Sequence, residues 1–83
     1  MGTVSHADLK EDLIFIIAKL AEQDRDSVSL EHRIREDLGM DSLKSMEAIS
    51  RITELYDVDP DLDELAELKT VGDIFEYMLK QVG

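Results

Sequence analysis

The chain has 83 residues, of which 20 are acidic and 9 basic, and its formal net charge is −11. Such a charge repels nucleic acid and anionic membrane surfaces and attracts basic patches on other proteins. Because cysteine is absent, the chain has no disulfide and no cysteine-ligated metal, which fits a reducing cytoplasm. The longest apolar run, 13–18, is too short to span a bilayer. We expect a single domain over 1–83, since a chain of this length builds only one modest core. We also expect the protein to be monomeric and cytoplasmic.

Apolar residues near the start of the chain recur every three or four positions, which is the spacing of one helix face. We therefore predict a first helix over about 6–22. The β-branched stretch 14–17 has strand propensity, but no other segment of similar character is present to pair with it. The positions that set the helical spacing are Leu9, Leu13, Ile16 or Ile17, and Leu20.

The segment 24–41 has no sustained period and is predicted to be a long loop. Loops of this length are unusual in small domains and often carry function. Four apolar residues spread along the segment can hold it against a helical core: Val28, Leu30, Ile34 and Leu38.

A second helix is predicted over about 42–56, directly after this loop. Gly39 permits a sharp turn because it tolerates backbone angles that other residues avoid, and Asp41 and Ser42 are both good helix N-cap residues. Ser42 thus places a hydroxyl at the N-terminus of a helix, where backbone N–H groups and the helix dipole favour an anionic group such as a phosphate ester. The apolar face of the helix comprises Leu43, Met46, Ile49, Ile52 and then Leu55 or Tyr56.

Two further helices complete the chain. Pro60 cannot continue the second helix, and apolar spacing predicts a short helix over about 62–68. A final helix is predicted over about 71–81, with Thr70 and Asp73 spaced as in a capping box. Three longer helices and one short one, with a long loop between the first two, predict an all-α four-helix bundle.

Aspartates at alternate positions from Asp57 to Asp63 are spaced like the first ligands of an EF-hand calcium loop. The pattern fails at two decisive positions, because Leu62 replaces the glycine and Leu68 replaces the glutamate. A divalent-ion binder is therefore disfavoured, and we expect no metal site. We also expect no catalytic residue, since Ser42 lacks the Gly-x-Ser-x-Gly context of a serine nucleophile and a positioned base.

One string resembles the prosthetic-group attachment motif of acyl carrier proteins of the fatty-acid and polyketide type: Glu36-Asp37-Leu38-Gly39-x-Asp41-Ser42-Leu43. A second string is similar to the entry into the last helix of that family: Leu68-x-Thr70-Val71-Gly72-Asp73-Ile74. The resemblance covers about 8–80 and implies the acyl-carrier bundle. It implies that Ser42 bears 4′-phosphopantetheine from coenzyme A, and that Asp41 and Leu43 contribute to binding this cofactor. The chain would then be the substrate of a phosphopantetheinyl transferase and not an enzyme.

The resemblance also implies what the loaded protein does. The thiol at the end of the arm would hold acyl intermediates as thioesters and carry them between synthases, transferases and other acyl-loading or acyl-processing enzymes of fatty-acid, polyketide or related specialised biosynthesis. Partner enzymes would dock at Leu43, Lys44, Met46, Glu47, Arg51 and Glu54. An acyl chain would enter a cleft lined by Met46, Ile49, Ile52, Leu62, Leu65 and Leu68.

The charges on the second helix depart from the family pattern. Lys44 stands where fatty-acid carriers usually have an acid, and Arg51 adds a second positive charge. Glu47 lies three residues from Lys44 and four from Arg51, so intrahelical ion pairs are also available. These charges indicate a partner set other than a generic fatty-acid synthase. The alternative function is a small acidic interaction module that carries no prosthetic group.

Overall fold

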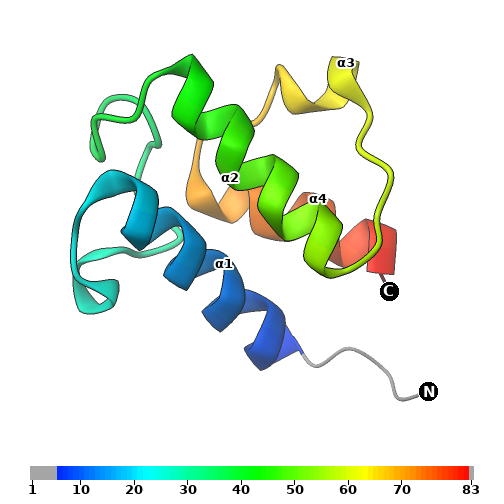
Figure 1. Cartoon of the computed structure of the whole chain (residues 1–83), viewed down its shortest axis with the longest axis horizontal. Coiled ribbons are helices and arrows are strands. Elements are labelled where there is room, and N and C mark those ends of the chain that lie inside the picture. Colours follow the sequence, from blue (N-terminus) through cyan, green and yellow to red (C-terminus); the bar gives the residue numbers. More distant parts are fainter. Residues whose placement is uncertain (1–5, 83) are drawn as a thin grey trace.

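The computed structural model of the protein describes residues 6–82, without the side chains of His6, Ala7 and Leu62. Over this range the elements are α1 (His6–Ala21), a 3-10 turn η1 (Arg25–Ser27), α2 (Ser42–Leu55), α3 (Leu62–Leu65) and α4 (Val71–Val82). Helix α1 packs against both α2 and α4, and α3 lies in the connection from α2 to α4 (Figure 1). The predicted all-α fold is therefore confirmed. None of these helices has the length and apolar character needed to cross a membrane.

The core is built from one face of each longer helix, together with residues of the long loop. On α1, Ile17 takes the inward position while Ile16 is only partly buried. The largest fully buried side chains are Leu9, Leu13, Ile17, Met40, Ile52, Thr53, Val71, Ile74 and Met78. Thr53, the polar member of this set, donates its hydroxyl to the carbonyl of Ile49 over 2.8 Å, so its burial leaves no lost hydrogen bond.

Helices α1 and α2 each end one residue before the predicted boundary, and both end in the same way. Glu22 and Asp57 have φ of 58° and 56°, in the left-handed region. The next residue donates its N–H to a carbonyl in the last helical turn. Gln23 N–H donates to the carbonyl of Ala18 over 2.9 Å, and Val58 N–H donates to the carbonyl of Thr53 over 2.8 Å. A left-handed residue followed by this backbone bond is a common way to end a helix.

The predicted short helix over 62–68 is too long, because α3 ends at Leu65. After it, the N–H of Glu67 donates to the carbonyl of Glu64 and the N–H of Leu68 to that of Leu65, each over 3.1 Å. Hydrogen bonds that span three residues are those of a 3-10 turn, which is tighter than an α-helix, so the α-helix ends before them. Helix α4 runs one residue past its predicted end, to Val82.

The predicted capping box at the start of α4 is confirmed. Thr70 Oγ1 accepts the N–H of Asp73 over 3.0 Å, and Asp73 Oδ2 accepts the N–H of Thr70 over 3.1 Å. The same carboxylate accepts the N–H of Lys69 over 3.0 Å. The bond from Lys69, followed by those from Thr70, lowers the pKa of Asp73 below its ordinary value.

Backbone hydrogen bonds hold the long loop to the start of α4. The N–H of Ile34 donates to the carbonyl of Lys69 over 2.9 Å, and the N–H of Val71 donates to the carbonyl of His32 over 3.0 Å. Between these bonds, residues 33 and 70 form an isolated antiparallel bridge. The predicted apolar contacts of the loop are also present, since Val28, Ile34 and Leu38 are buried and Leu30 is partly buried.

Gly72→Ala is expected to lower the free energy of unfolding by about 1–2 kcal/mol. A Cβ at this position would lie 2.9 Å from the carbonyl oxygen of Leu30, which also accepts the N–H of Gly72 over 2.8 Å. Overpacking of this kind costs about 1–3 kcal/mol, and the better helix propensity of alanine offsets up to about 1 kcal/mol. Urea denaturation measures the change. Gln81→Ala, on the exposed side of α4, is the control, and its free energy of unfolding should stay within about 0.5 kcal/mol of the wild-type value. An equally small change in Gly72→Ala would contradict the prediction.

Tyr56 connects the end of α2 to α1, because its hydroxyl donates to Asp12 Oδ2 over 2.6 Å. Partial burial, and then the bond to this carboxylate, raise the pKa of Tyr56 well above its ordinary value of 10.0. A raised pKa in the folded state contributes stability that is present below pH 10 and is lost as the pH rises further. We expect the wild type to be about 1 kcal/mol more stable than Tyr56→Phe at pH 7. The stability difference between the two proteins should shrink when urea denaturation is repeated above pH 10. A difference that does not depend on pH would contradict the raised pKa of Tyr56.

Candidate functional site

The start of α2 is set by the turn that precedes it. Gly39 has a φ of +69°, as expected for a residue that enters the left-handed region without steric cost. Asp41 is the N-cap, since its carboxylate accepts the N–H of Lys44 over 2.8 Å and its carbonyl accepts the N–H of Ser45 over 3.0 Å. Capping is therefore performed by Asp41, and the exposed side chain of Ser42, the first helical residue, takes no part in it.

Met40 attaches this turn to the core. Its side chain is 2% exposed, and its N–H donates to the carbonyl of Ile34 over 3.1 Å. Leu38 and Met40 are buried while Gly39 and Asp41 are exposed, so the chain alternates inward and outward as it approaches Ser42. The attachment motif leaves position 40 open and gives no indication of this burial. The alternation of apolar residues at 38 and 40 is the signal in the sequence that could have found it.

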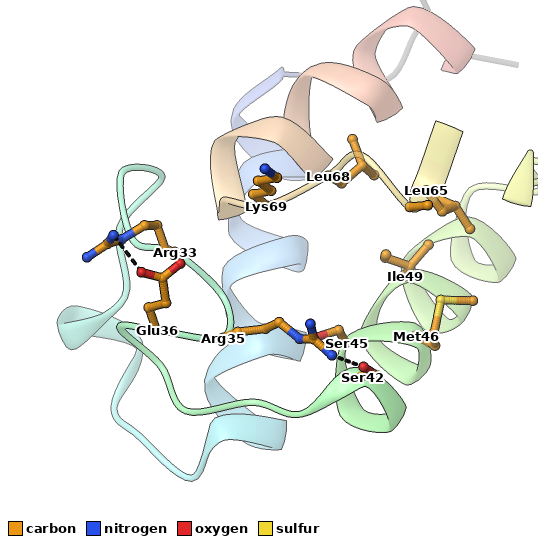
Figure 2. A pocket seen from close by; sticks show the side chains of 11 residues that line it. Arg33, Arg35, Glu36, Ser42, Ser45, Met46, Ile49, Leu65, Leu68 and Lys69 are labelled. Carbon is orange, nitrogen blue, oxygen red and sulfur yellow. Dashed lines mark hydrogen bonds and ion pairs between the residues drawn. The ribbon is translucent and has the colours of Figure 1, made fainter. Parts of the chain in front are cut away.

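A groove of about 360 Å³ opens beside Ser42 (Figure 2). Its apolar part lies between α2, with Met46 and Ile49, and the segment from α3 onward, with Leu65 and Leu68. The end next to Ser42 is polar. The polar lining consists of Arg33, Arg35, Glu36, Ser42, Ser45 and Lys69.

Only some of the residues predicted to line an acyl cleft are found in the lining of this groove. Met46, Ile49, Leu65 and Leu68 line it. Ile52 does not, because it lies in the core with no exposed surface, and the side chain of Leu62 is outside the described part of the structure. The cationic lining of the groove was not found from the sequence, because it is brought there by the pairing of the long loop with the start of α4.

The charges around Ser42 are arranged by the loop. Arg35 Nη2 donates to Ser42 Oγ. Glu36 and Asp37, the first two acids of the motif, bond instead to Arg33, whose Nη1 lies 2.7 Å from Glu36 Oε2 and whose Nη2 lies 3.3 Å from Asp37 Oδ1. The backbone N–H of Arg33 and then its guanidinium lower the pKa of Asp37. Glu36 and Asp37 are thus paired within the loop, and the side chain of Arg35 faces the serine.

The outer face of α2 exposes large apolar side chains next to Ser42. Leu43 is 77% exposed and Met46 is 43% exposed. Glu54 is also exposed, further along the helix. Exposed apolar side chains gathered in this way are typical of surfaces that contact another molecule.

The charged side chains of this face form one of the two predicted intrahelical pairs. Arg51 Nη2 lies 2.6 Å from Glu47 Oε2. The pair expected between Lys44 and Glu47 is not seen, because Lys44 Nζ lies 3.8 Å from Glu22 Oε2, just past the end of α1. Lys44 therefore contacts the neighbouring helix end, which sequence spacing alone does not indicate.

His32, the histidine nearest to Ser42 in the sequence, is bonded within its own loop. Its Nδ1 accepts the N–H of Ser29 over 3.1 Å. Among the side chains that the structure describes, moreover, no three or more from histidine, aspartate or glutamate gather closely enough to hold a metal ion. Ser42 itself is exposed, and its hydroxyl accepts a hydrogen bond from Arg35.

Ser42 is thus an exposed serine at the first residue of a helix, and a groove opens beside it. The sequence model of the family described as "Phosphopantetheine attachment site" matches residues 11–78, and the chain belongs to this family. Its members are carriers and not catalysts, and the prosthetic group is phosphopantetheine. The geometry fits that group, because the serine hydroxyl is accessible, is not used in capping, and borders the groove.

Individual relatives agree with this assignment. The acyl carrier protein of Exiguobacterium sibiricum is 32% identical, over 80% of this chain and 84% of its own, and that of Syntrophobacter fumaroxidans is 31% identical, over 89% and 91%. Methylphloroacetophenone synthase of Cladonia uncialis is 34% identical over 93% of this chain, which spans only 3% of that protein. A solved structure of a candidate acyl carrier protein from Mycobacterium tuberculosis matches with a TM-score of 0.80 at 25% identity, covering 87% of this chain and 96% of that one.

Proposed function

We propose that Ser42 is the residue that bears phosphopantetheine, and that the loaded protein presents acyl groups to a succession of partner enzymes. The observation that carries the proposal is the position of Ser42, exposed at the first residue of α2 and next to the groove. When bound, the arm supplies a terminal thiol that holds an acyl group as a thioester. The protein supplies the place of attachment and the surfaces that contact the arm and the partners.

The attachment is a phosphoryl transfer in which this chain is the substrate. Ser42 Oγ attacks the β-phosphate of coenzyme A, so that an oxygen–phosphorus bond forms and the bond to adenosine 3′,5′-bisphosphate breaks. The transferase takes the serine proton and holds the magnesium. The N-terminus of α2 favours the negative charge that remains on the phosphodiester, through its free N–H groups and its dipole.

We infer that partners dock on the face of α2 that carries Leu43 and Met46, bounded by charges of both signs. Lys44 and Arg51 make this face less acidic than the chain as a whole, whose net charge is −11. A mixed surface of this kind complements partners other than those that select a uniformly acidic helix. The relatives include both short acyl carrier proteins and a segment of a large synthase. We therefore propose a polyketide or related specialised pathway in preference to generic fatty-acid synthesis.

Mass spectrometry of the intact protein tests the attachment. The protein is incubated with coenzyme A, magnesium and a phosphopantetheinyl transferase of broad specificity, and the product is then digested and its peptides are sequenced. We expect the mass of one phosphopantetheinyl group, located on the peptide that contains Ser42. If the folded protein gains no mass while a known carrier in the same reaction is modified, the proposal fails and an interaction module without a prosthetic group becomes the better description.

A further inference from the structure

We propose that Arg35 binds the phosphate of the attached arm and holds the arm on the groove side of Ser42. This inference rests on the proposed attachment at Ser42 and assigns a role to a residue of the long loop, outside the attachment motif. It is carried by three features: the contact between the two side chains, the charges around them, and the way the loop fixes the position of Arg35.

The contact places the guanidinium at the atom that would become esterified. The Arg35 side chain reaches from the loop to α2, and its Nη2 donates to Ser42 Oγ (Figure 2). In a phosphodiester at this serine, phosphorus is bonded directly to Oγ, so the unesterified oxygens lie two bonds from the atom that Arg35 already contacts. A guanidinium binds such oxygens with charge-assisted, often paired hydrogen bonds.

The charge of Arg35 is available for this purpose. Within 6–82, no carboxylate lies within 4.0 Å of its guanidinium, whereas Arg33 and Arg51 both form ion pairs at short distance. A phosphodiester would add a negative charge to a chain whose net charge is already −11. Because Asp41 is the residue next to Ser42, a nearby cation offsets repulsion that would otherwise be felt at short range.

The backbone directly before Arg35 is anchored. Ile34 is buried at 3% exposure, its N–H donates to the carbonyl of Lys69 over 2.9 Å, and its carbonyl accepts the N–H of Met40 over 3.1 Å. Arg35 therefore extends from an anchored position and needs little further ordering to reach the phosphate. Since Arg35 and Ser42 both line the groove, a phosphate held between them starts the arm toward the apolar walls.

The test compares the unmodified and fully loaded forms of four proteins: wild type, Arg35→Gln, Arg35→Lys and the matched control Arg51→Gln. Loading is first confirmed by mass, and the folding equilibrium constant of each form is then measured by urea denaturation. We expect loading to raise this constant about two- to fivefold more in the wild type than in Arg35→Gln, as for an exposed charge contact. Arg51→Gln should behave like the wild type, Arg35→Lys should retain part of the gain, and added salt should reduce the wild-type gain. Equal gains in the wild type and Arg35→Gln would overturn the inference.

A second measurement reports the contact without any substitution. In the wild type, loading should shift the NMR signal of the Arg35 Nε–Hε group and leave that of Arg51 in place. An unchanged Arg35 signal refutes the contact even if Arg35→Gln does not fold. Failure of loading itself would refute the attachment at Ser42, while full loading with no dependence on Arg35 refutes only the inference about Arg35.

Discussion

Ser42→Ala is expected to abolish attachment of the arm completely, whereas Ser45→Ala should be loaded to completion. The two serines lie three residues apart on the same helix and both line the groove. Their surroundings differ, because the Ser45 hydroxyl donates to the carbonyl of Asp41 over 2.9 Å while Ser42 is exposed at the helix start. Intact mass after treatment with transferase, coenzyme A and magnesium measures the difference.

The loss in Ser42→Ala should not arise from unfolding. Asp41, and not Ser42, supplies the cap of α2, so the substitution should change the free energy of unfolding by no more than about 0.5 kcal/mol. Circular dichroism and urea denaturation check this directly. A Ser42→Ala protein that is still modified would show that another hydroxyl accepts the arm, and peptide sequencing would then identify it.

Met40→Ala is expected to lower the free energy of unfolding by about 2–5 kcal/mol, as for other truncations of buried Met, Leu or Ile side chains. Met40 is 2% exposed and belongs to the same cluster as the cores of α1, α2 and α4. Small domains are stable by only about 5–15 kcal/mol, so the loss is a large part of the total. Because Met40 anchors the turn before Ser42, loading should fall with the folded fraction.

Leu43→Ala is the matched control for this prediction. Leu43 lies three residues further along the same motif and is also a large apolar residue, but its side chain is 77% exposed. Its truncation should change the free energy of unfolding by no more than about 0.5 kcal/mol, and its effect should appear in binding to partner enzymes. Equal losses in Met40→Ala and Leu43→Ala would contradict the burial of Met40. Urea denaturation of the two variants in parallel decides the matter.

Local patterns in the sequence determined the class of fold and the residue proposed to carry the arm. The recurrence of apolar residues predicted α1, α2 and α4 to within one residue at every end, because a helix buries one face and repeats every 3.6 residues. The capping box of Thr70 and Asp73 and the turn at Gly39 were also predictable, since each depends on residues within a few positions of one another. The same holds for the string around Ser42, which indicates a carrier without reference to any distant segment.

Only the tertiary structure decided which distant groups meet at the start of α2. Arg35 and Lys69 come to one groove because the backbone of the loop pairs with the chain before α4, and Lys44 lies near Glu22 because α1 packs beside α2. The burial of Met40 likewise depends on helices far away in the sequence. These contacts join residues separated by many positions, so no periodic pattern or short motif encodes them. They follow from the packing of the helices and from the pairing of the loop with the chain before α4, and this pairing places a cation at the serine.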